Sequence, residues 1–351
     1  MVACLDVTGD PGRIHAEGLT ARVAVEEARA RVADLAGARP REVVFTSGAT
    51  EAIAAACWGA AGRGSHQVVP AVEHSAVRQA AARHGDVTAV PVDGRGRVAV
   101  DDLVSAIRPG ETALIHLQWG NHEVGTTQPV VEAVAACREL GVLVHVDAAQ
   151  ALGRVPVAFR DLGADLVSVS AHKLGGPAGV GALLVRQGLR LPPLLVGGDQ
   201  ERARRAGLEN VAGVAGFGAA CAAVAGRVED EGGEQRRLTG RILAALGSPG
   251  LDGLTVYGDP DGRLPHIVCL GVAGIEPQAV LLGLDRAGVA AHSGSACSSE
   301  SLEPSPVLEA MGVDAHHSLR LSAGWSTTDG DVDRLLDALP RVLADLRALG
   351  R

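Results

Sequence analysis

Residues 166–176 read LVSVSAHKLGG: a short apolar pattern, typical of a buried strand, runs directly into a histidine, a lysine and a glycine turn. Lys173 is the single lysine among the 351 residues, because every other basic residue is arginine. A lysine can lose its proton near neutral pH and act as a nucleophile, whereas an arginine cannot. Open α/β sheets also bind their ligands at strand ends. The stretch therefore predicts an α/β fold and makes Lys173 the first candidate for chemistry.

Short apolar strands and helical patterns alternate on both sides of this stretch. Strand patterns lie at residues 42–45, 67–69, 87–92, 113–117, 142–146, 166–169 and 180–185, and helical patterns at 21–35, 75–83, 100–107 and 130–140. Such alternation predicts a mostly parallel sheet that is covered by helices on both faces.

A second, smaller unit is expected after residue 245. A long helical pattern at residues 210–246, interrupted near 231–233, could bridge two domains. The patterns beyond it predict strands and helices at 254–257, 266–272, 277–287, 289–292, 318–322 and 329–349. We therefore expect a large domain at residues 10–245 and a small C-terminal α+β domain at 246–351, with residues 1–9 packing near the small domain.

Composition excludes several classes of protein. A net charge of −9 argues against a general binder of nucleic acid or of anionic membranes. No apolar run approaches the roughly 20 residues that a membrane span needs. The first residues lack the pattern of a signal peptide, so we expect a cytoplasmic protein with reduced thiols. No two of the six cysteines form a C-x-x-C pair, so no metal site is expected.

Two further stretches place polar groups beside predicted strands. Asp147 ends the strand at 142–146, and a carboxylate and an amine at two strand ends suit pyridoxal phosphate, whose ring nitrogen pairs with an acid and whose aldehyde reacts with a lysine. Residues 47–51, SGATE, separate a strand from a helix, where backbone N–H groups can hold a phosphate. Each signal alone is ambiguous, because an Asp or a small polar residue there also serves as a turn or helix cap.

In their order along the chain, these pieces resemble the cysteine desulfurases, the NifS-like branch of the class V aminotransferases. The resemblance covers about residues 10–349, and its most specific blocks are 46–51, 73–77, 121–125, 146–150, 170–176, 197–207 and 293–299. It implies the pyridoxal-phosphate fold type I: a large, mostly parallel seven-stranded sheet domain and a small C-terminal α+β domain, in a homodimer. It also implies that L-cysteine is converted to L-alanine and that the sulfur passes to an acceptor protein.

The resemblance assigns roles to individual residues. It implies that Lys173 forms the Schiff base with the cofactor and later transfers protons, and that His74 stacks on the ring and shuttles protons. Arg320, in the predicted strand at 318–322, would bind the substrate carboxylate, which its planar fork suits. The cofactor contacts that it implies are Ala49, Thr50, His74, His122, Asp147, Gln150, Ser170, His172 and Lys173.

Cys297 differs from the other five cysteines in its surroundings. The others lie among apolar or small residues, as packing cysteines do, whereas Cys297 lies in a small, polar, glycine-containing stretch at 291–299. The resemblance implies that its thiolate attacks the sulfur of the substrate and carries it as a persulfide. That chemistry needs a lowered thiol pKa, and hence a nearby cation.

Three departures from the family pattern stand out. His122 occupies the second position of the family's Asn-Asn-Glu block, so we transfer the cofactor contact to a bulkier, titratable side chain. Leu208 replaces the threonine of the Arg-x-Gly-Thr block, which in the family reaches the phosphate of the partner subunit. The segment before residues 12–18 is shorter than in the family, which could alter the substrate preference.

Two alternatives remain open at this point. The departures also fit a related enzyme that acts as a C–S lyase or selenocysteine lyase on another amino acid, against which Cys297 argues. They also fit a non-catalytic scaffold for sulfur carriers, against which Lys173 argues, because a binding module needs no nucleophilic amine. The product distinguishes the two enzymes, because desulfuration of cysteine gives alanine whereas β-elimination by a lyase gives pyruvate. An absorption spectrum distinguishes the scaffold, which would show no band from a bound cofactor.

Overall fold

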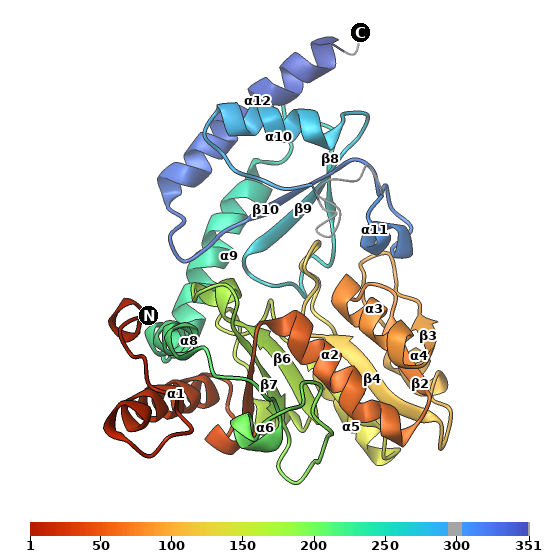
Figure 1. The fold of residues 1–351 in the computed structure, drawn as a ribbon. Coiled ribbons are helices and arrows are strands. Elements are labelled where there is room, and N and C mark those ends of the chain that lie inside the picture. The colour runs from red at the N-terminus through yellow and green to blue at the C-terminus, as the bar shows by residue number, and fades with distance from the viewer. Residues whose placement is uncertain (294–303, 350–351) are drawn as a thin grey trace. The chain divides into compact units, whose positions relative to one another are not determined.

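The computed structural model describes residues 1–293 and 304–349 and divides the chain into two compact units. Unit 1 comprises Met1–Val90, Ala99–Trp119 and Pro129–Glu229, and unit 2 comprises Pro91–Val98, Gly120–Gln128 and Asp230–Arg351. Figure 1 shows the elements along the chain. Unit 2 thus draws on two short excursions from the first half of the chain, which no local sequence pattern announces.

A sheet of seven strands, counted over the described residues, forms the centre of unit 1. Its strands are β1 (Val43–Thr46), β2 (His66–Pro70), β3 (Asp86–Val90), β4 (Thr112–Gln118), β5 (Leu143–Asp147), β6 (Leu166–Ser170) and β7 (Gly181–Val185). They lie in the order β1-β7-β6-β5-β4-β2-β3, and only β7 is antiparallel to its neighbours. The expected fold class, a mostly parallel α/β sheet, is confirmed.

Helices and short turns make up much of the rest of unit 1. They are α1 (Ala16–Leu35), α2 (Ala49–Ala60), α3 (Ser75–His84), α4 (Val100–Ser105), α5 (Val130–Glu139), α6 (Phe159–Leu162), α7 (Gln200–Ala203) and α8 (Val211–Val224), with short 3-10 turns η1 (Val2–Cys4), η2 (Pro40–Glu42), η3 (Ala61–Arg63) and η4 (Ala171–Leu174). The strands β2, β4, β5, β6 and β7 are buried along their whole length, which explains why they read as apolar runs. The helix α2 packs against β5, β6 and β7.

The helices α1 and α8 lie side by side, which Figure 1 also shows. Gly218 of α8 permits this approach, because a Cβ atom there would lie 2.5 Å from the Cα atom of Ala28 in α1. Small residues along α8 therefore decide how closely the two helices pack.

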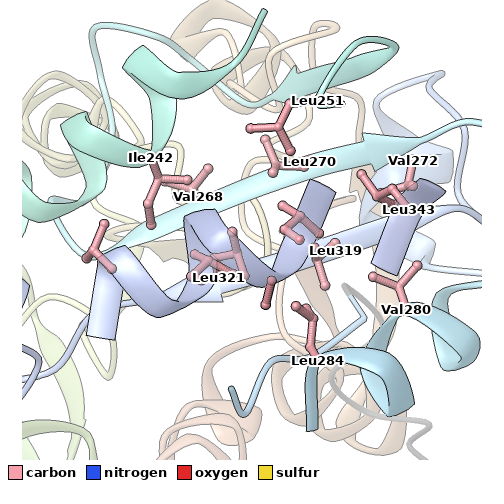
Figure 2. Close-up of a cluster of buried hydrophobic side chains, with 14 of the residues drawn as sticks. Ile242, Leu251, Val268, Leu270, Val272, Val280, Leu284, Leu319, Leu321 and Leu343 are labelled. Carbon is pink, nitrogen blue, oxygen red and sulfur yellow. The ribbon is translucent and has the colours of Figure 1, made fainter. Parts of the chain in front are cut away.

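Unit 2 is built around a three-stranded antiparallel sheet, counted over the described residues. Its elements are α9 (Val228–Ala245), β8 (Leu254–Tyr257), β9 (Ile267–Val272), α10 (Pro277–Arg286), α11 (Pro306–Ala310), β10 (Ser318–Ser322) and α12 (Asp329–Leu349), and the strand order is β10-β9-β8. Figure 2 shows side chains from α9, β9, β10, α10 and α12 meeting in one apolar cluster. This cluster gives unit 2 a hydrophobic core of its own.

Two local expectations are wrong. The break in the long helical pattern falls between α8 and α9, where Gly226 has φ +74°, and not near residues 231–233, which lie inside α9. Residues 289–292 form no strand beyond one bridge between His292 and Arg320, because the Val289 N–H caps α10 by donating to the Leu284 carbonyl (2.9 Å). Residues 1–9 belong to unit 1, where η1 packs on α8, and their packing near the small domain stays a prediction.

The division into domains at residues 245 and 246 stays a prediction, since the compact units part inside α9 after Glu229. Within the described residues no single helix has the length and apolar composition to cross a membrane, and α8 with α9 meets that test only as a bent pair.

Candidate active site

The turn between β1 and α2 has the form of a phosphate-binding turn. The first N–H groups of a helix have no partner inside it, and here they belong to Ala49 and Thr50. A Cβ atom built on Gly48 meets, among the described residues, only the Oγ atom of Ser170, at 3.8 Å. Ser170 Oγ in turn lies 2.9 Å from Nδ1 of His172. Backbone and side-chain donors therefore line a space beside Gly48 that fits a phosphate group.

Asp147 stands at the carboxyl end of β5 and is only 9% exposed. Its Oδ1 atom accepts hydrogen bonds from the Ala149 N–H (3.0 Å) and from the Ser168 hydroxyl on the neighbouring strand β6 (3.1 Å). These two donors orient the carboxylate. A buried and oriented carboxylate of this kind fits a cationic ring nitrogen.

Glu73 is a buried acid for which sequence reasoning gave no role. It is 1% exposed, and its Oε1 atom accepts the Gln118 N–H at 2.5 Å, while Oε2 has no hydrogen-bond partner among the described residues. Burial first, and then the nearby charge of Asp147, raise the pKa of Glu73 well above its ordinary range. Burial therefore favours the protonated form of Glu73. Its position directly before His74 is the signal in the sequence that could have found it.

Replacing this acid by its neutral analogue, Glu73→Gln, should flatten the pH dependence of the free energy of unfolding. The raised pKa means that the folded protein keeps a proton that the unfolded chain releases, so stability falls as the pH rises above the unfolded value of about 4.3. The slope is about 1.4 kcal/mol per pH unit until the folded-state pKa is reached. We expect the variant to gain on the wild type with rising pH, measured by urea unfolding of cofactor-free protein between about pH 5 and 8.

The matched control is Glu132→Gln, at an exposed position of α5, which should follow the wild type at every pH. Parallel curves for Glu73→Gln and the wild type would show that Glu73 is ionised in the folded protein.

His74 is the N-cap residue of α3. Its Nδ1 atom accepts the Ala76 N–H at 3.0 Å. Because a backbone N–H only donates, the neutral ring carries its proton on Nε2. The local helix start therefore fixes which nitrogen of His74 can donate.

Lys173 lies in η4, directly after β6, and is partly buried. The turn closes through a hydrogen bond from the Gly176 N–H to the Ala171 carbonyl (2.9 Å), and Gly175 adopts φ +86°, a left-handed conformation that glycine favours. The Lys173 carbonyl accepts a bond from Arg154 (3.1 Å). The glycines at 175 and 176 thus form the tight turn that follows the lysine.

The carboxyl ends of parallel strands meet at one edge of a sheet. The strands β1, β2, β5 and β6 run in the same direction, so the residues that follow them belong to that edge. The structure places there eight of the predicted site residues, namely Ala49, Thr50, His74, Asp147, Gln150, Ser170, His172 and Lys173.

The other two described site residues belong to unit 2, where they contact each other. Arg320 of β10 donates from Nη1 to the His122 carbonyl at 2.9 Å. The turn that holds His122 is shaped by Asn121, whose Oδ1 atom accepts the N–H groups of Glu123 (2.8 Å) and Val124 (2.9 Å). The predicted substrate arginine and the unusual histidine thus form one local arrangement.

Two further residues singled out from the sequence are Cys297 and Leu208. Cys297 lies outside the described residues, so its predicted role stays a prediction. Leu208 is 64% exposed in unit 1 and carries an apolar side chain where the family has a threonine.

Comparison with known proteins agrees with this geometry. The family Aminotransferase class-V matches residues 6–335. Cysteine desulfurase IscS 1 of Archaeoglobus fulgidus is 40% identical over 97% of this chain and 91% of its own length. A cysteine desulfurase of Gluconacetobacter diazotrophicus is 42% identical over 97% of this chain and 88% of its own length. A solved NifS-like protein superposes with a TM-score of 0.90 at 30% identity, covering 98% of this chain and 94% of its own.

Both the match to the family and the identity to named relatives extend over nearly the whole chain. The family implies an enzyme that uses pyridoxal phosphate, and the residues at the carboxyl edge of the sheet fit that cofactor. The chain belongs to the class-V aminotransferase family and, within it, to the cysteine desulfurases.

Proposed function

We propose that this protein takes sulfur from free L-cysteine, releases L-alanine and carries the sulfur as a persulfide on Cys297 to an acceptor protein. The observation that carries the proposal is the position of Lys173. It is the single lysine of the chain and follows β6 at the edge of the sheet where Asp147 ends β5. We further propose that the enzyme works in the cytoplasm as a homodimer.

The cofactor, when bound, supplies an electron sink that stabilises negative charge on the substrate carbon next to the amine. Asp147 pairs with the ring nitrogen, for which the Ala149 N–H and the Ser168 hydroxyl hold its carboxylate in place. The start of α2, with Ser170 and His172, holds the phosphate. Gln150 and His122 complete the contacts that we assign to the cofactor.

Proton transfers fall to Lys173 and His74. Lys173 would hold the cofactor through its amine, and the same amine, when free, would take up and return a proton. His74 presents Nε2 as its donor, because Nδ1 is held by the Ala76 N–H. Arg320 binds the substrate carboxylate with its planar guanidinium group.

Cys297 is the nucleophile that we propose for the sulfur transfer. Four other cysteines are buried, and burial raises the thiol pKa to about 11 for Cys137 and to about 12 for Cys57, Cys221 and Cys269. A thiol with so high a pKa is protonated at working pH and is a poor nucleophile. In the proposed step the Cys297 thiolate attacks the substrate sulfur, the carbon–sulfur bond breaks, a sulfur–sulfur bond forms, and the carbon takes up a proton to give alanine.

The product distinguishes desulfuration from the rival lyase reaction. With L-cysteine and a thiol reductant we expect alanine and sulfide in equal amounts, measured by amino-acid analysis and a sulfide assay, and no pyruvate. Pyruvate in place of alanine would establish β-elimination and overturn the proposal. His122 and Leu208 favour testing selenocysteine in parallel, since both replace family residues. A purified protein that takes up no pyridoxal phosphate would instead establish the scaffold alternative.

A further inference from the structure

The loop Gly197–Gly207 adopts a backbone conformation that its sequence does not favour. Glu201, Arg202 and Ala203 have φ values of +49°, +59° and +60°, and none of them is glycine. In this left-handed region the Cβ atom of an L-residue crowds the backbone, so three such residues in succession persist only where surrounding contacts impose them.

Buried contacts from α1 and β1 impose this conformation. Glu201 is 5% exposed and receives two hydrogen bonds from Arg29, from Nη1 to Oε2 and from Nη2 to Oε1, each at 2.7 Å. Glu201 Oε2 also accepts the Phe45 N–H at 2.9 Å. Arg29 is 2% exposed, lies over the Phe45 ring at 4.7 Å and donates to the Val43 carbonyl. Two charges buried this deeply stay together, because each is costly without the other.

The loop carries Arg205 to the phosphate-type turn. Arg205 donates from Nε to Oε1 of Glu51 at 2.9 Å, and from Nη2 to Oε2 at 3.3 Å. Glu51, in the first turn of α2, accepts the Ser47 N–H at 2.8 Å. A cavity of about 140 Å³ is lined by residues of both segments, among them Ser47, Glu201 and Arg205.

Glu51 poses an electrostatic problem for a phosphate at this turn. A carboxylate in the first turn of α2 repels a second anion bound at the same helix start unless a cation offsets it. Arg205 is the group that pairs with Glu51, and the pair is only partly exposed (25% and 13% for the two side chains). Solvent therefore screens the repulsion only in part, and the place of Arg205 matters for phosphate binding.

We propose that Arg29 and Glu201 are positioning residues for the phosphate of the cofactor. Their buried pair holds the left-handed loop, the loop holds Arg205, and Arg205 neutralises Glu51 beside the turn at Ser47. The inference rests on the proposed function, since it takes the phosphate to be that of pyridoxal phosphate.

The test replaces Arg29 by lysine, which keeps the charge and loses the planar fork. In Arg29→Lys we expect pyridoxal phosphate to bind the cofactor-free protein roughly tenfold more weakly, the worth of one lost charge-assisted hydrogen bond, with pyridoxal unaffected. Arg31→Lys, on the exposed side of the same helix, is the matched control and should bind both compounds as the wild type does. Dissociation constants come from absorbance titrations with each compound.

Neutralising Glu51 tests the electrostatic step. In Glu51→Gln the amide oxygen can still accept the Ser47 N–H, but the negative charge is gone. The double variant Arg29→Lys/Glu51→Gln should therefore regain the affinity for pyridoxal phosphate. Equal weakening of pyridoxal and pyridoxal phosphate in Arg29→Lys, or no recovery in the double variant, would contradict this role.

Limited trypsin digestion tests the loop without any cofactor. Trypsin cuts after arginine, and the loop contains Arg202, Arg204 and Arg205. We expect these cuts, located by mass spectrometry, to occur roughly tenfold faster in Arg29→Lys than in Arg31→Lys. Equal rates, or faster cleavage throughout the chain, would overturn the inference. A wild-type protein that binds no pyridoxal phosphate would overturn the proposed function instead, and the digestion would still decide whether the buried pair holds the loop.

Discussion

Lys173→Arg should abolish desulfurase activity and covalent cofactor binding while the positive charge is kept. Arginine stays protonated at working pH and cannot form the bond to the cofactor aldehyde. The loss should be at least roughly a thousandfold, because proton transfer by a positioned side chain alone contributes about 10² to 10⁴. Borohydride reduction of the wild type with cofactor, followed by peptide mass spectrometry, should label residue 173, and in the variant this label should disappear.

The composition of the chain makes this experiment unusually clear. Because Lys173 is the single lysine, only the N-terminal amine can compete for the label. Arg63→Lys adds an amine in the 3-10 turn η3 and serves as the control, since it should retain activity and remain unlabelled at position 63. A label at any position other than 173 would contradict the assignment.

Cys297→Ser should remove the persulfide and leave the cofactor in place. A hydroxyl is a far weaker nucleophile than a thiolate and cannot accept the sulfur, so sulfide release should fall to the background rate. The absorbance of the bound cofactor should be that of the wild type, because the cofactor contacts that we assign involve no cysteine. Alkylation after a single turnover with cysteine, followed by mass spectrometry, measures the persulfide directly.

Cys4 provides the matched control for this variant. It is the described cysteine that is only partly buried, whereas the other four described ones are buried. Cys4→Ser should therefore keep full persulfide formation. Undiminished sulfide release by Cys297→Ser, or loss of release in Cys4→Ser, would place the nucleophile elsewhere.

The fold class was predictable because it depends on local pattern. The strands β4, β5 and β6 are each buried on both faces, so their apolar runs stand out in the sequence, and the predicted ends differ from the observed ones by at most one residue. The strand predicted at residues 289–292 does not form, because a backbone N–H that a strand would need is already bonded to a helix. The N–H of Val289 caps a helix and cannot join a strand, which no apolar pattern reveals.

In the candidate site, too, some residues are marked by local sequence pattern and others only by the folded structure. Lys173 and Asp147 could be found because each lies at the carboxyl end of an apolar strand pattern. Such strand ends have a known position in this architecture before any contact is seen. The sequence marks Glu73 only by its position directly before His74, because its burial and its proximity to Asp147 are set by the folded sheet.

The amino-acid sequence alone was thus enough to predict the seven strands of the large sheet, the candidate lysine and the expected cofactor, because periodicity and residue chemistry are properties of neighbouring residues. The raised pKa of Glu73, the donor nitrogen of His74 and the pair between Arg29 and Glu201 required the folded chain. Arg29 and Glu201 are 172 positions apart, and both are charged residues that ordinarily face solvent. Only folding buries them together, and the low dielectric around them turns two surface-type residues into a contact that holds a left-handed loop.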